Sequence, residues 1–250
     1  MRLPGLHLDI SEVIQFFSLA KKRFESNENL FRFQRFQGEK LFERKEFSFK
    51  DEIILEIGCG TGGFGSAASD LGGKVFLMDY EFMDLNPSIK EKFRGRIIKA
   101  DGLALPFKEE AFGFLICSSV IEHVDRPGAF IEEVYRILRK SGICYLSYPP
   151  FFSLKGGHHI APFHFLGENI GIKAWSLFFK KRLPAKDLRY ANLWGKFGLT
   201  PLTIKDVEAM IRKTPMKIQK ISTRFCSFNF AKIPILRELL TWHVEFFLKK

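Results

Sequence analysis

The spacing of apolar and polar residues divides the chain into a regular central part and two less regular ends. From Ile53 onward, short apolar runs alternate with segments whose apolar residues recur at helical spacing. The runs that predict strands are IILEI (53–57), KVFLMD (74–79), RIIKA (96–100), FGFLICSS (112–119) and ICYLSY (143–148). Residues 64–71 and 128–140 predict helices, ended by Gly72-Gly73 and by Ser141-Gly142. This alternation predicts a parallel sheet with helices on both faces.

The two ends of the chain carry different patterns. Residues 9–24 have helical spacing, and residues 30–49 alternate phenylalanine with arginine, lysine and glutamine. Such a mixture can bind single-stranded nucleic acid, but we favour an amphipathic helix that buries its phenylalanine side. After Pro150 the alternation stops until Thr203, which with Asp206 is placed like a helix-capping pair. The remaining pattern predicts a helix, a strand, a short helix and a last strand, over 203–213, 216–223, 233–240 and 243–250.

Composition adds an uneven charge distribution to this picture. Residues 1–150 hold 21 Lys and Arg against 22 Asp and Glu, whereas residues 151–250 hold 18 against 6, so the net charge of +11 comes from the last hundred residues. A basic region of this kind suits an anionic partner such as a phosphate, an acidic lipid surface or nucleic acid; alternatively it is a solvated face that aids solubility. The chain also has 29 phenylalanines, which implies a well-filled core.

Several classes of protein are disfavoured. No apolar run approaches the roughly 20 residues that a membrane helix needs, and the N-terminus lacks the apolar core of a signal peptide. The four cysteines are widely spaced and show no zinc-binding pattern. We therefore expect reduced thiols in a cytoplasmic protein.

Candidate chemistry lies in the loop after the first predicted strand. GCGTGG (58–63) joins that strand to a helix, and its glycines permit a ligand to approach the backbone and the free N–H groups of the helix N-terminus. Asp79, at the end of the next strand, is placed to bind ribose hydroxyls. The loop and the acid together predict a nucleotide-like ligand.

At this point the sequence resembles a known family. LEIGCGTGGFG (55–65) is similar to the first motif of the class I S-adenosylmethionine-dependent methyltransferases, and KADGLALPF (99–107) is similar to the segment after their third strand. Residues 112–150 resemble the type 11, ubiquinone-biosynthesis-like branch of these enzymes. The resemblance implies a Rossmann-like, mostly parallel seven-stranded sheet with helices on both faces and an antiparallel last strand. It also implies S-adenosylmethionine as the cofactor.

The resemblance implies roles for individual residues around that cofactor. Glu56 and the loop glycines would shape the pocket for its methionine part, and Asp79 would accept hydrogen bonds from both ribose hydroxyls. Tyr80 would stack near the adenine, Asp101 would accept from the adenine amino group, and Ser118 would lie near the amino group of the methionine part. The implied cofactor-binding residues are Glu56, Gly58, Cys59, Gly60, Thr61, Gly62, Asp79, Tyr80, Asp101, Gly102, Leu103 and Ser118.

The same resemblance divides the chain into four parts and shows one departure from the family pattern. The parts are an N-terminal helical segment that covers the cofactor site (1–50), a cofactor-binding core (51–150), a basic, aromatic-rich substrate cap inserted after the fifth strand (151–202) and a C-terminal completion of the sheet (203–250). The family usually has an aspartate near the start of the fourth strand, where this chain has Phe112-Gly113-Phe114.

Histidines are the candidate catalytic residues. His123 follows the fourth strand and would touch the substrate or act as a general base; otherwise it caps the local turn. His158 and His159 in GGHHIAPFH (156–164) follow the fifth strand, at the sheet edge where ligands bind in open α/β folds. Either is a candidate base, or both are hydrogen-bonded loop residues. We expect no metal site, because no cysteine is close and the nearest downstream acid is Glu168.

The cap segment bears on the partners. IKAWSLFFKK (172–181) has helical spacing, and its apolar rings lie beside cations. This combination suits an acceptor with a greasy portion and a phosphate or carboxylate, such as a lipid-linked or glycosyl intermediate, and equally suits peripheral docking on an acidic membrane. The last segment, 243–250, would be such a membrane-surface helix in one reading, but its β-branched and aromatic residues favour a strand.

The sequence therefore predicts transfer of a methyl group to oxygen or nitrogen of a small-molecule, lipid or sugar-containing acceptor. One alternative is an RNA methyltransferase, suggested by the basic half and by residues 30–49. Against it, the chain shows no separate nucleic-acid-binding module, and Tyr148-Pro-Pro-Phe151 follows the wrong strand for a base-methylating motif. The other alternative is a non-catalytic S-adenosylmethionine-binding subunit that activates a partner.

Overall fold

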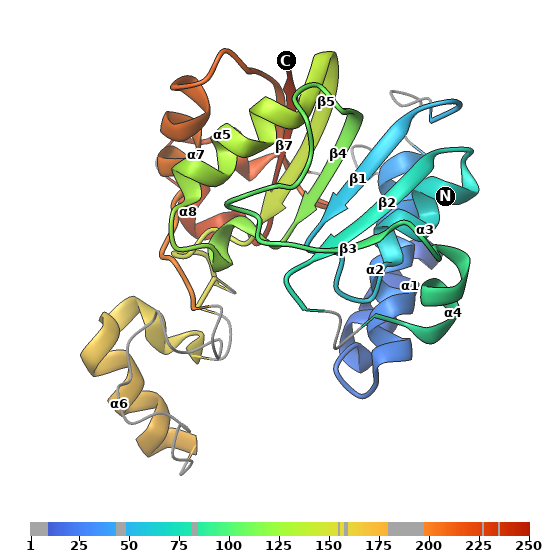
Figure 1. Cartoon of the computed structure of the whole chain (residues 1–250). Coiled ribbons are helices and arrows are strands. Elements are labelled where there is room, and N and C mark those ends of the chain that lie inside the picture. The colour runs from blue at the N-terminus through green and yellow to red at the C-terminus, as the bar shows by residue number, and fades with distance from the viewer. Residues whose placement is uncertain are drawn as a thin grey trace.

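The sheet at the centre of the molecule confirms the predicted fold class. The structure is a computed structural model that describes residues 10–43, 49–81, 85–154, 156–157, 160–179, 198–226, 228–234 and 236–250. Within these residues, seven strands form one sheet in the order β3-β2-β1-β4-β5-β7-β6 (Figure 1). The strands are β1 (Ile53–Ile57), β2 (Lys74–Asp79), β3 (Ile97–Lys99), β4 (Phe112–Ser118), β5 (Leu138–Tyr148), β6 (Lys217–Thr223) and β7 (Val244–Lys249). The last strand, β7, runs antiparallel to both of its neighbours.

Helices cover both faces of this sheet. They are α1 (Ile10–Lys22), α2 (Asn27–Phe42), α3 (Gly63–Asp70), α4 (Pro87–Lys92), α5 (Pro127–Ile137), α6 (Glu168–Phe179), α7 (Ile204–Arg212) and α8 (Arg237–Leu240). One core cluster joins α5 and α7 to the sheet, and a second joins α2, α3 and α4 to its other face. Figure 1 shows these two layers on opposite sides of the strands. None of the helices within the described residues has the length and apolar character needed to cross a bilayer.

Local sequence signals account for where α7 begins. Thr203 Oγ1 accepts from the backbone N–H of Asp206 at 3.0 Å, and the Asp206 carboxylate accepts from the backbone N–H of Thr203 at 3.0 Å. This reciprocal pair satisfies N–H groups that the first turn of a helix leaves without partners. The predicted capping pair is therefore confirmed.

The junction between α5 and β5 differs from the sequence prediction. The helix ends at Ile137, and Leu138 already pairs with Phe112 as the first residue of β5. Ser141 and Gly142, which were expected to end the helix, instead lie in an irregular part of β5, where Ser141 has a φ of 62°. There the Ser141 N–H donates to the carbonyl of Lys250 at 3.1 Å. The turn signal in the sequence thus marks a distortion within the strand, because β7 supplies the hydrogen bonds for it.

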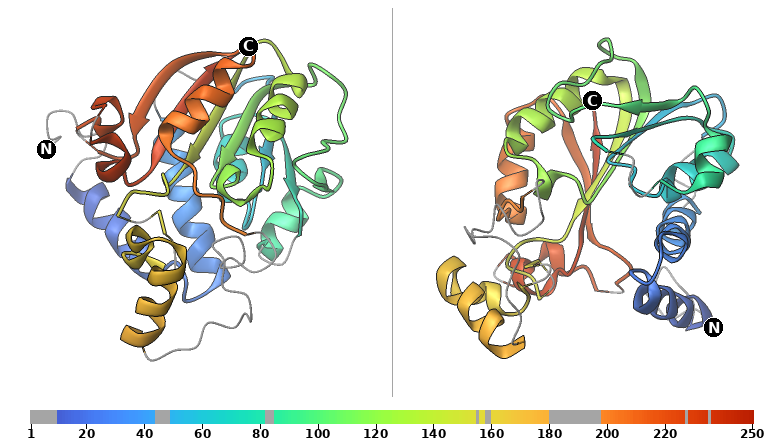
Figure 2. Two further views of the ribbon diagram at one scale, coloured as in Figure 1. Left: turned by 90° about the vertical axis from the view of Figure 1, so that its left-hand side faces the viewer. Right: turned by 60° about the horizontal axis from the view of Figure 1, so that its bottom comes forward.

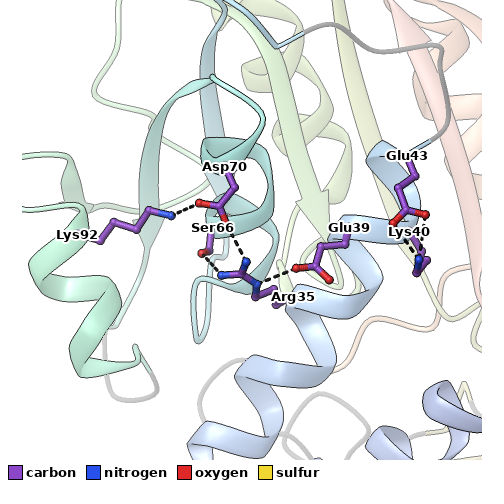
Figure 3. Close-up of polar contacts among 7 residues, drawn as sticks. All are labelled: Arg35, Glu39, Lys40, Glu43, Ser66, Asp70 and Lys92. Atoms are coloured by element: carbon purple, nitrogen blue, oxygen red, sulfur yellow. Dashed lines mark hydrogen bonds and ion pairs between the residues drawn. The ribbon is translucent and has the colours of Figure 1, made fainter. Parts of the chain in front are cut away.

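The N-terminal helix α2 packs directly on α3. The contact depends on Gly63, since a Cβ at that position would lie 2.6 Å from the backbone nitrogen of Arg35. Polar contacts surround the packed surface: Arg35 binds Asp70 of α3 at 2.8 Å and Glu39 of its own helix at 2.8 Å (Figure 3). Lys92 binds the second oxygen of Asp70 at 2.5 Å, which ties α4 to the same point. Residues 30–42 of the predicted segment 30–49 therefore belong to an amphipathic helix with a buried apolar side, whereas residues 44–48 lie outside the described residues and Phe49 lies outside the helix.

The described part of the insertion after β5 forms a small unit at the carboxyl edge of the sheet. Its own core consists of Phe151, Ile160 and Leu199, with Trp175 of α6 packed against them. The insertion is tied back to the main body because the N–H of Phe151 donates to the carbonyl of Leu202 at 2.9 Å. Figure 2 shows α6 projecting from the same end of the molecule at which α1 lies.

Candidate functional site

A cavity of about 840 Å³ opens at the carboxyl edge of the sheet and has two chemically different halves. One half, which we call the cofactor half, is lined by the ends of β1, β2 and β4 and by the segment after β3. The predicted site residues that line the cavity are Glu56, Gly58, Gly60, Asp79, Tyr80, Asp101, Gly102, Leu103, Ser118 and His123. The structure therefore brings together most of the residues that the sequence nominated.

The glycine loop leaves the sheet through left-handed backbone conformations. Gly58, Gly60 and Gly62 have φ values of 67°, 52° and 82°, a region that other residues rarely adopt. At Gly58 the space is also closed, since a Cβ there would collide with Val120 Cγ2. Gly62 is the N-cap of α3 and offers no side chain to the N–H groups of the first turn, one of which, that of Gly65, donates to Glu56 instead.

Three acids, Glu56, Asp79 and Asp101, lie near the glycine loop in the cofactor half. Asp79 Oδ2 accepts from the N–H of Gly60 at 2.8 Å, so the acid and the loop hold each other in place. Asp101 Oδ1 accepts from the N–H of Leu103 at 2.8 Å. Glu56 is buried and accepts from the N–H of Gly65 at 2.7 Å. Burial, which the Gly65 N–H opposes and the nearby charge of Asp79 assists, raises the pKa of Glu56 to about 8.

Three nominated residues do not line the cavity. Cys59 and Thr61 are fully buried: the Cys59 N–H donates to the carbonyl of Met78 at 3.0 Å, and the Thr61 hydroxyl donates to Gln34 Oε1. Gly62 faces Ile89 of α4, in a position that a Cβ would overfill. These residues shape the loop from behind.

The arrangement fits S-adenosylmethionine on grounds of shape and charge. Gly60 and Phe64 bring the cavity to the N-terminus of α3, and a helix N-terminus suits the carboxylate of an amino acid. An acid at the end of the second strand suits vicinal ribose hydroxyls, and Asp79 has that position with its carboxylate already aligned by Gly60. Asp101 and Tyr80 lie further along the same half of the cavity, where a base would extend. The residues present therefore match the parts of the cofactor that the sequence assigned to them.

The second half, which we call the acceptor half, comes from segments that no motif marked. Its apolar wall consists of aromatic rings. Phe16 and Phe17 come from α1, Phe24 from the turn after α1, Phe33 from α2, and Trp242 from the segment just before β7. Phe16 packs edge-on against Trp242, with ring centroids 5.9 Å apart. Of the described residues in 151–202, the predicted cap, only Ala161 lines this cavity.

A buried arginine forms the polar floor of the acceptor half. Arg224 Nη1 donates to Gln37 Oε1 at 2.9 Å, and Nη2 donates to Ser118 Oγ at 3.1 Å and to the Tyr145 hydroxyl at 2.7 Å. Its counter-ion is Glu245, with 3.5 Å between Nε and Oε1. Both Arg224 and Gln37 line the cavity. The only local signal for this role was an arginine directly after a predicted strand.

His123 lies in the loop after β4 and is oriented by the residues that return from the insertion. Its Nδ1 lies 3.0 Å from the carbonyl oxygen of Gly198. A carbonyl only accepts, so Nδ1 carries the proton and Nε2 has the lone pair. Burial lowers the pKa of His123, which keeps the ring neutral near pH 7. The role of His123 as a base or as a local cap stays a prediction, and this geometry leaves Nε2 as its basic nitrogen.

Glu122 lies beside this histidine and is unusual. It is buried, and within the described residues neither carboxylate oxygen has a hydrogen-bond partner. Its Oε1 lies 4.0 Å from His123 Nε2. Burial raises the pKa of Glu122 to about 8, although the charge of Arg224 opposes the shift. An acid that is mostly neutral at pH 7 therefore adjoins the lone pair of His123.

The other histidine candidates contribute less. His158 and His159 lie outside the described residues, and their predicted role stays a prediction. His164 is buried, and its Nε2 lies 3.0 Å from the carbonyl of Ser153, inside the insertion. The described part of the chain holds no group of three His, Cys, Asp or Glu that could bind a metal.

The start of β4 has Phe112-Gly113-Phe114 where the methyltransferase family usually has an aspartate, and the surroundings of Gly113 bear on this departure. Above Gly113, Arg139 binds Glu52 at 2.6 Å, and a Cβ at Gly113 would collide with Glu52 Oε2. An aspartate at this position would require the Glu52 and Arg139 side chains to move. The departure lies at the start of β4, away from the carboxyl ends of the strands that line the cofactor half.

Comparisons with known proteins agree with this geometry. A family model described as a methyltransferase domain matches residues 55–146. An uncharacterised methyltransferase of Mycobacterium avium is 30% identical over 192 residues, which cover 75% of this chain and 72% of that protein. One of Mycobacterium leprae is 30% identical over 132 residues, and the match spans about half of each chain, 52% of this one and 48% of the relative.

Two solved structures share the fold. One is described as a S-adenosylmethionine-dependent methyltransferase and possible histamine N-methyltransferase from Thermotoga maritima; it has a TM-score of 0.52 and 20% identity, and covers 94% of this chain and 97% of its own. The other is a S-adenosylmethionine-dependent methyltransferase from Archaeoglobus fulgidus with a TM-score of 0.54 and 16% identity, covering 89% and 97%.

The fold and the site thus define a Rossmann-like methyltransferase with a preformed nucleotide-cofactor site. The chain belongs to the class I S-adenosylmethionine-dependent methyltransferases. S-adenosylmethionine is accordingly its cofactor. Assignment to the ubiquinone-biosynthesis-like branch stays a prediction.

Proposed function

We propose that the protein transfers the methyl group of S-adenosylmethionine to a hydroxyl or amine of an amphipathic small molecule, lipid or sugar-containing acceptor. The observation that carries this proposal is one continuous cavity in which a cofactor half joins an acceptor half, with His123 among its lining residues. A non-catalytic cofactor-binding subunit would not need an acceptor half of this kind.

Each half has its own task. Glu56, Asp79 and Asp101 would hold the cofactor together with the glycine loop. When bound, S-adenosylmethionine supplies a methyl group already activated by its sulfonium. The remaining requirement is to align the nucleophile and exclude water, and positioning of this kind supplies much of the acceleration.

The acceptor half favours an apolar body with an oxygen-bearing head. The rings of Phe16, Phe33 and Trp242 offer a wall against which such a body packs. Gln37 and Arg224 offer N–H donors at the floor, which suit carbonyl, hydroxyl or carboxylate oxygens. These side chains would set which acceptor binds.

His123 would take the proton that the acceptor loses. Its neutral ring presents Nε2 as the basic nitrogen, because Nδ1 is held by Gly198. The protonated ring would lower the pKa of the Glu122 carboxyl, which lies 4.0 Å away. The acceptor's proton would thus be held on His123 during the transfer and be released to solvent afterwards, which restores the neutral ring.

Calorimetry tests the cofactor half. Wild-type protein should bind S-adenosylmethionine and its demethylated product, and Asp79→Ala should weaken binding by about 10- to 100-fold, since a hydrogen bond to a charged group contributes about 1.5–3 kcal/mol. Asp70→Ala, an acid on the outer side of α3, serves as the matched control and should bind like wild type. No binding to the wild type, or unchanged affinity in Asp79→Ala, would contradict the proposal.

Turnover tests the acceptor half. Metabolites extracted from a strain that lacks the protein are incubated with it and with S-adenosylmethionine labelled in the methyl group. Wild type should label a species that in the deletion strain is lighter by one methyl group. His123→Ala should keep its cofactor affinity and lose about 10²- to 10⁴-fold in transfer rate, the usual contribution of a general base. Labelling of RNA and not of small metabolites would favour the RNA alternative.

A further inference from the structure

The exposed apolar side chains gather at one end of the molecule. Of the large apolar side chains that are exposed among the described residues, only those of Ile53 and Leu71 lie at the amino edge of the sheet. The others belong to segments that follow the carboxyl ends of strands, or to α1 and the turn after it, where Phe16 of α1 packs against Phe225 and Trp242. Figures 1 and 2 show α1 and α6 at this same end. The surface of a soluble protein that binds no partner would not concentrate apolar residues at one end in this way.

The outer side of α1 and of the turn after it carries exposed apolar residues at regular helical spacing. Ile14, Phe17, Lys21 and Phe24 follow one another at helical spacing, and Phe17 and Phe24 are 64% and 71% exposed. The opposite side of the helix is the one that packs inward through Phe16. The helix therefore has two apolar sides, and its inward packing accounts for only one of them.

The outer side of α6 repeats this composition. Ile170, Lys173, Leu177 and Phe178 follow at similar spacing, and Leu177 is 82% exposed. Its inner side packs through Ile172 and Trp175 onto the core of the insertion. In the sequence, the highly basic run KKRLPAK (180–186) follows α6 directly.

We propose that this end of the molecule, the outer sides of α1 and α6, docks on an anionic lipid bilayer. Helices that lie in a membrane interface combine apolar side chains with lysine and arginine at their borders, because the rings enter the acyl boundary while the cations bind lipid phosphates. Lys21, Lys22 and Lys173 supply such cations beside the exposed rings. A second protein of mixed charge would not require bases on both helices.

The docking surface is continuous with the acceptor half of the cavity. Phe17, Arg23 and Phe24 line the cavity, and Phe17 and Phe24 are also among the exposed rings of the turn and helix that would enter the bilayer. An acceptor dissolved in the membrane would then reach the acceptor half along α1 without crossing water. This last step rests on the proposed function; the docking itself does not.

Vesicle binding tests the docking without cofactor or acceptor. The full chain is sedimented with vesicles of phosphatidylcholine alone and of phosphatidylcholine with about one third phosphatidylglycerol, a composition that adds the negative surface on which interfacial helices depend. We expect binding to the acidic vesicles, weakened by salt. Phe17→Ser with Phe24→Ser, and separately Leu177→Ser with Phe178→Ser, should each reduce binding by about tenfold or more, because each removes two inserted side chains. Lys21→Gln with Lys22→Gln should reduce binding to acidic vesicles only.

Leu71→Ser is the matched control, since Leu71 is an exposed leucine at the opposite end of the sheet. It should bind vesicles like wild type, and calorimetry with S-adenosylmethionine on every variant confirms that each is folded. Failure of wild type to bind acidic vesicles would overturn the proposal, as would an equal loss in Leu71→Ser. A concentration-dependent dimer that is abolished by the α1 variants, with no vesicle binding, would instead assign the surface to a second copy of the chain. Loss of docking with intact cofactor binding leaves the proposed function standing.

Discussion

The two halves of the cavity are assembled in different ways. The cofactor half comes from consecutive strand ends, all within residues 56–123. Glu56 and Asp79 lie at the ends of β1 and β2, and Asp101 lies two residues after β3. The acceptor half joins α1 and α2 to Arg224 and Trp242, so that the hydrogen bond between Gln37 and Arg224 spans 187 residues of sequence. The cofactor half is therefore fixed by the parallel sheet itself, whereas the acceptor half requires both ends of the chain to be folded together.

The largest expected effect tests whether the two halves are separable. Arg224→Met should lower the free energy of unfolding by about 3–5 kcal/mol, because it leaves the buried Glu245 carboxylate without its counter-ion. It should also weaken cofactor binding, since Arg224 holds Ser118 in the cofactor half. Urea denaturation measures the first effect and calorimetry the second.

A double variant separates charge from packing in this case. Arg224→Met combined with Glu245→Gln should recover much of the lost stability, because no unpaired charge stays buried. If the single variant is as stable as wild type, Arg224 does not connect the two halves of the cavity. The cofactor half and the acceptor half would then be more independent of each other than the contacts of Arg224 suggest.

A smaller effect concerns the point where the halves meet. The pKa of Glu122 is raised by burial from 4.5 to about 8 in the folded protein. As pH rises between these values the unfolded state loses a proton that the folded state keeps, so this contribution to stability is full below about pH 4.5 and declines as pH rises through 8. Wild type should therefore lose about 2 kcal/mol more than Glu122→Gln between pH 6 and pH 8, at 1.36 kcal/mol for each pKa unit.

Denaturation of both proteins at pH 6, 7 and 8 measures that difference directly. Glu132→Gln, an exposed glutamate on α5, is the control and should follow the wild-type curve. Parallel curves for wild type and Glu122→Gln would show that the carboxyl is ionised in the folded protein, and would remove it as a partner for His123.

The smallest expected effect concerns how α2 is held on the cofactor half. Arg35→Ala removes the ion pairs with Glu39 and Asp70 that Figure 3 shows. These pairs are partly exposed, so the loss of stability should be below about 1 kcal/mol, and cofactor affinity should not change. A larger loss by thermal denaturation would mean that polar contacts, rather than the close packing at Gly63, keep α2 in place.

Much of the fold could be predicted because its signals are local. Each of the apolar runs that predicted a strand forms one, and the capping pair at Thr203 starts α7 as expected. The exception is instructive: Ser141-Gly142 is a genuine turn signal, yet the residues before it form a strand because Phe112 and the C-terminal Lys250 supply partners. A backbone that finds hydrogen bonds with distant strands overrides its local preference.

The site could be predicted only in part, and for the same reason. Asp79 was found because it ends the strand after the glycine loop, and strand ends in a parallel sheet meet at one edge. Glu56 and Asp101 were nominated by the resemblance to the methyltransferase family. His123 was nominated from the sequence, but its tautomer and its acidic neighbour depend on Gly198 and on burial. The predicted cap contributes only Ala161 among its described residues, and the wall comes from α1 and α2 instead.

By itself, the sequence determined the order of strands along the chain, the glycine loop and Asp79 after it, and hence a nucleotide-like ligand. These features depend on periodicity and on spacing within short segments, whereas the identity of the cofactor came from the resemblance to the methyltransferase family. Only the tertiary structure decided that Gln37, Arg224 and Trp242 share a cavity and that one end of the molecule is apolar on its outside. Contacts between distant segments are selected by packing and burial, and a side chain's burial is a property of the whole fold.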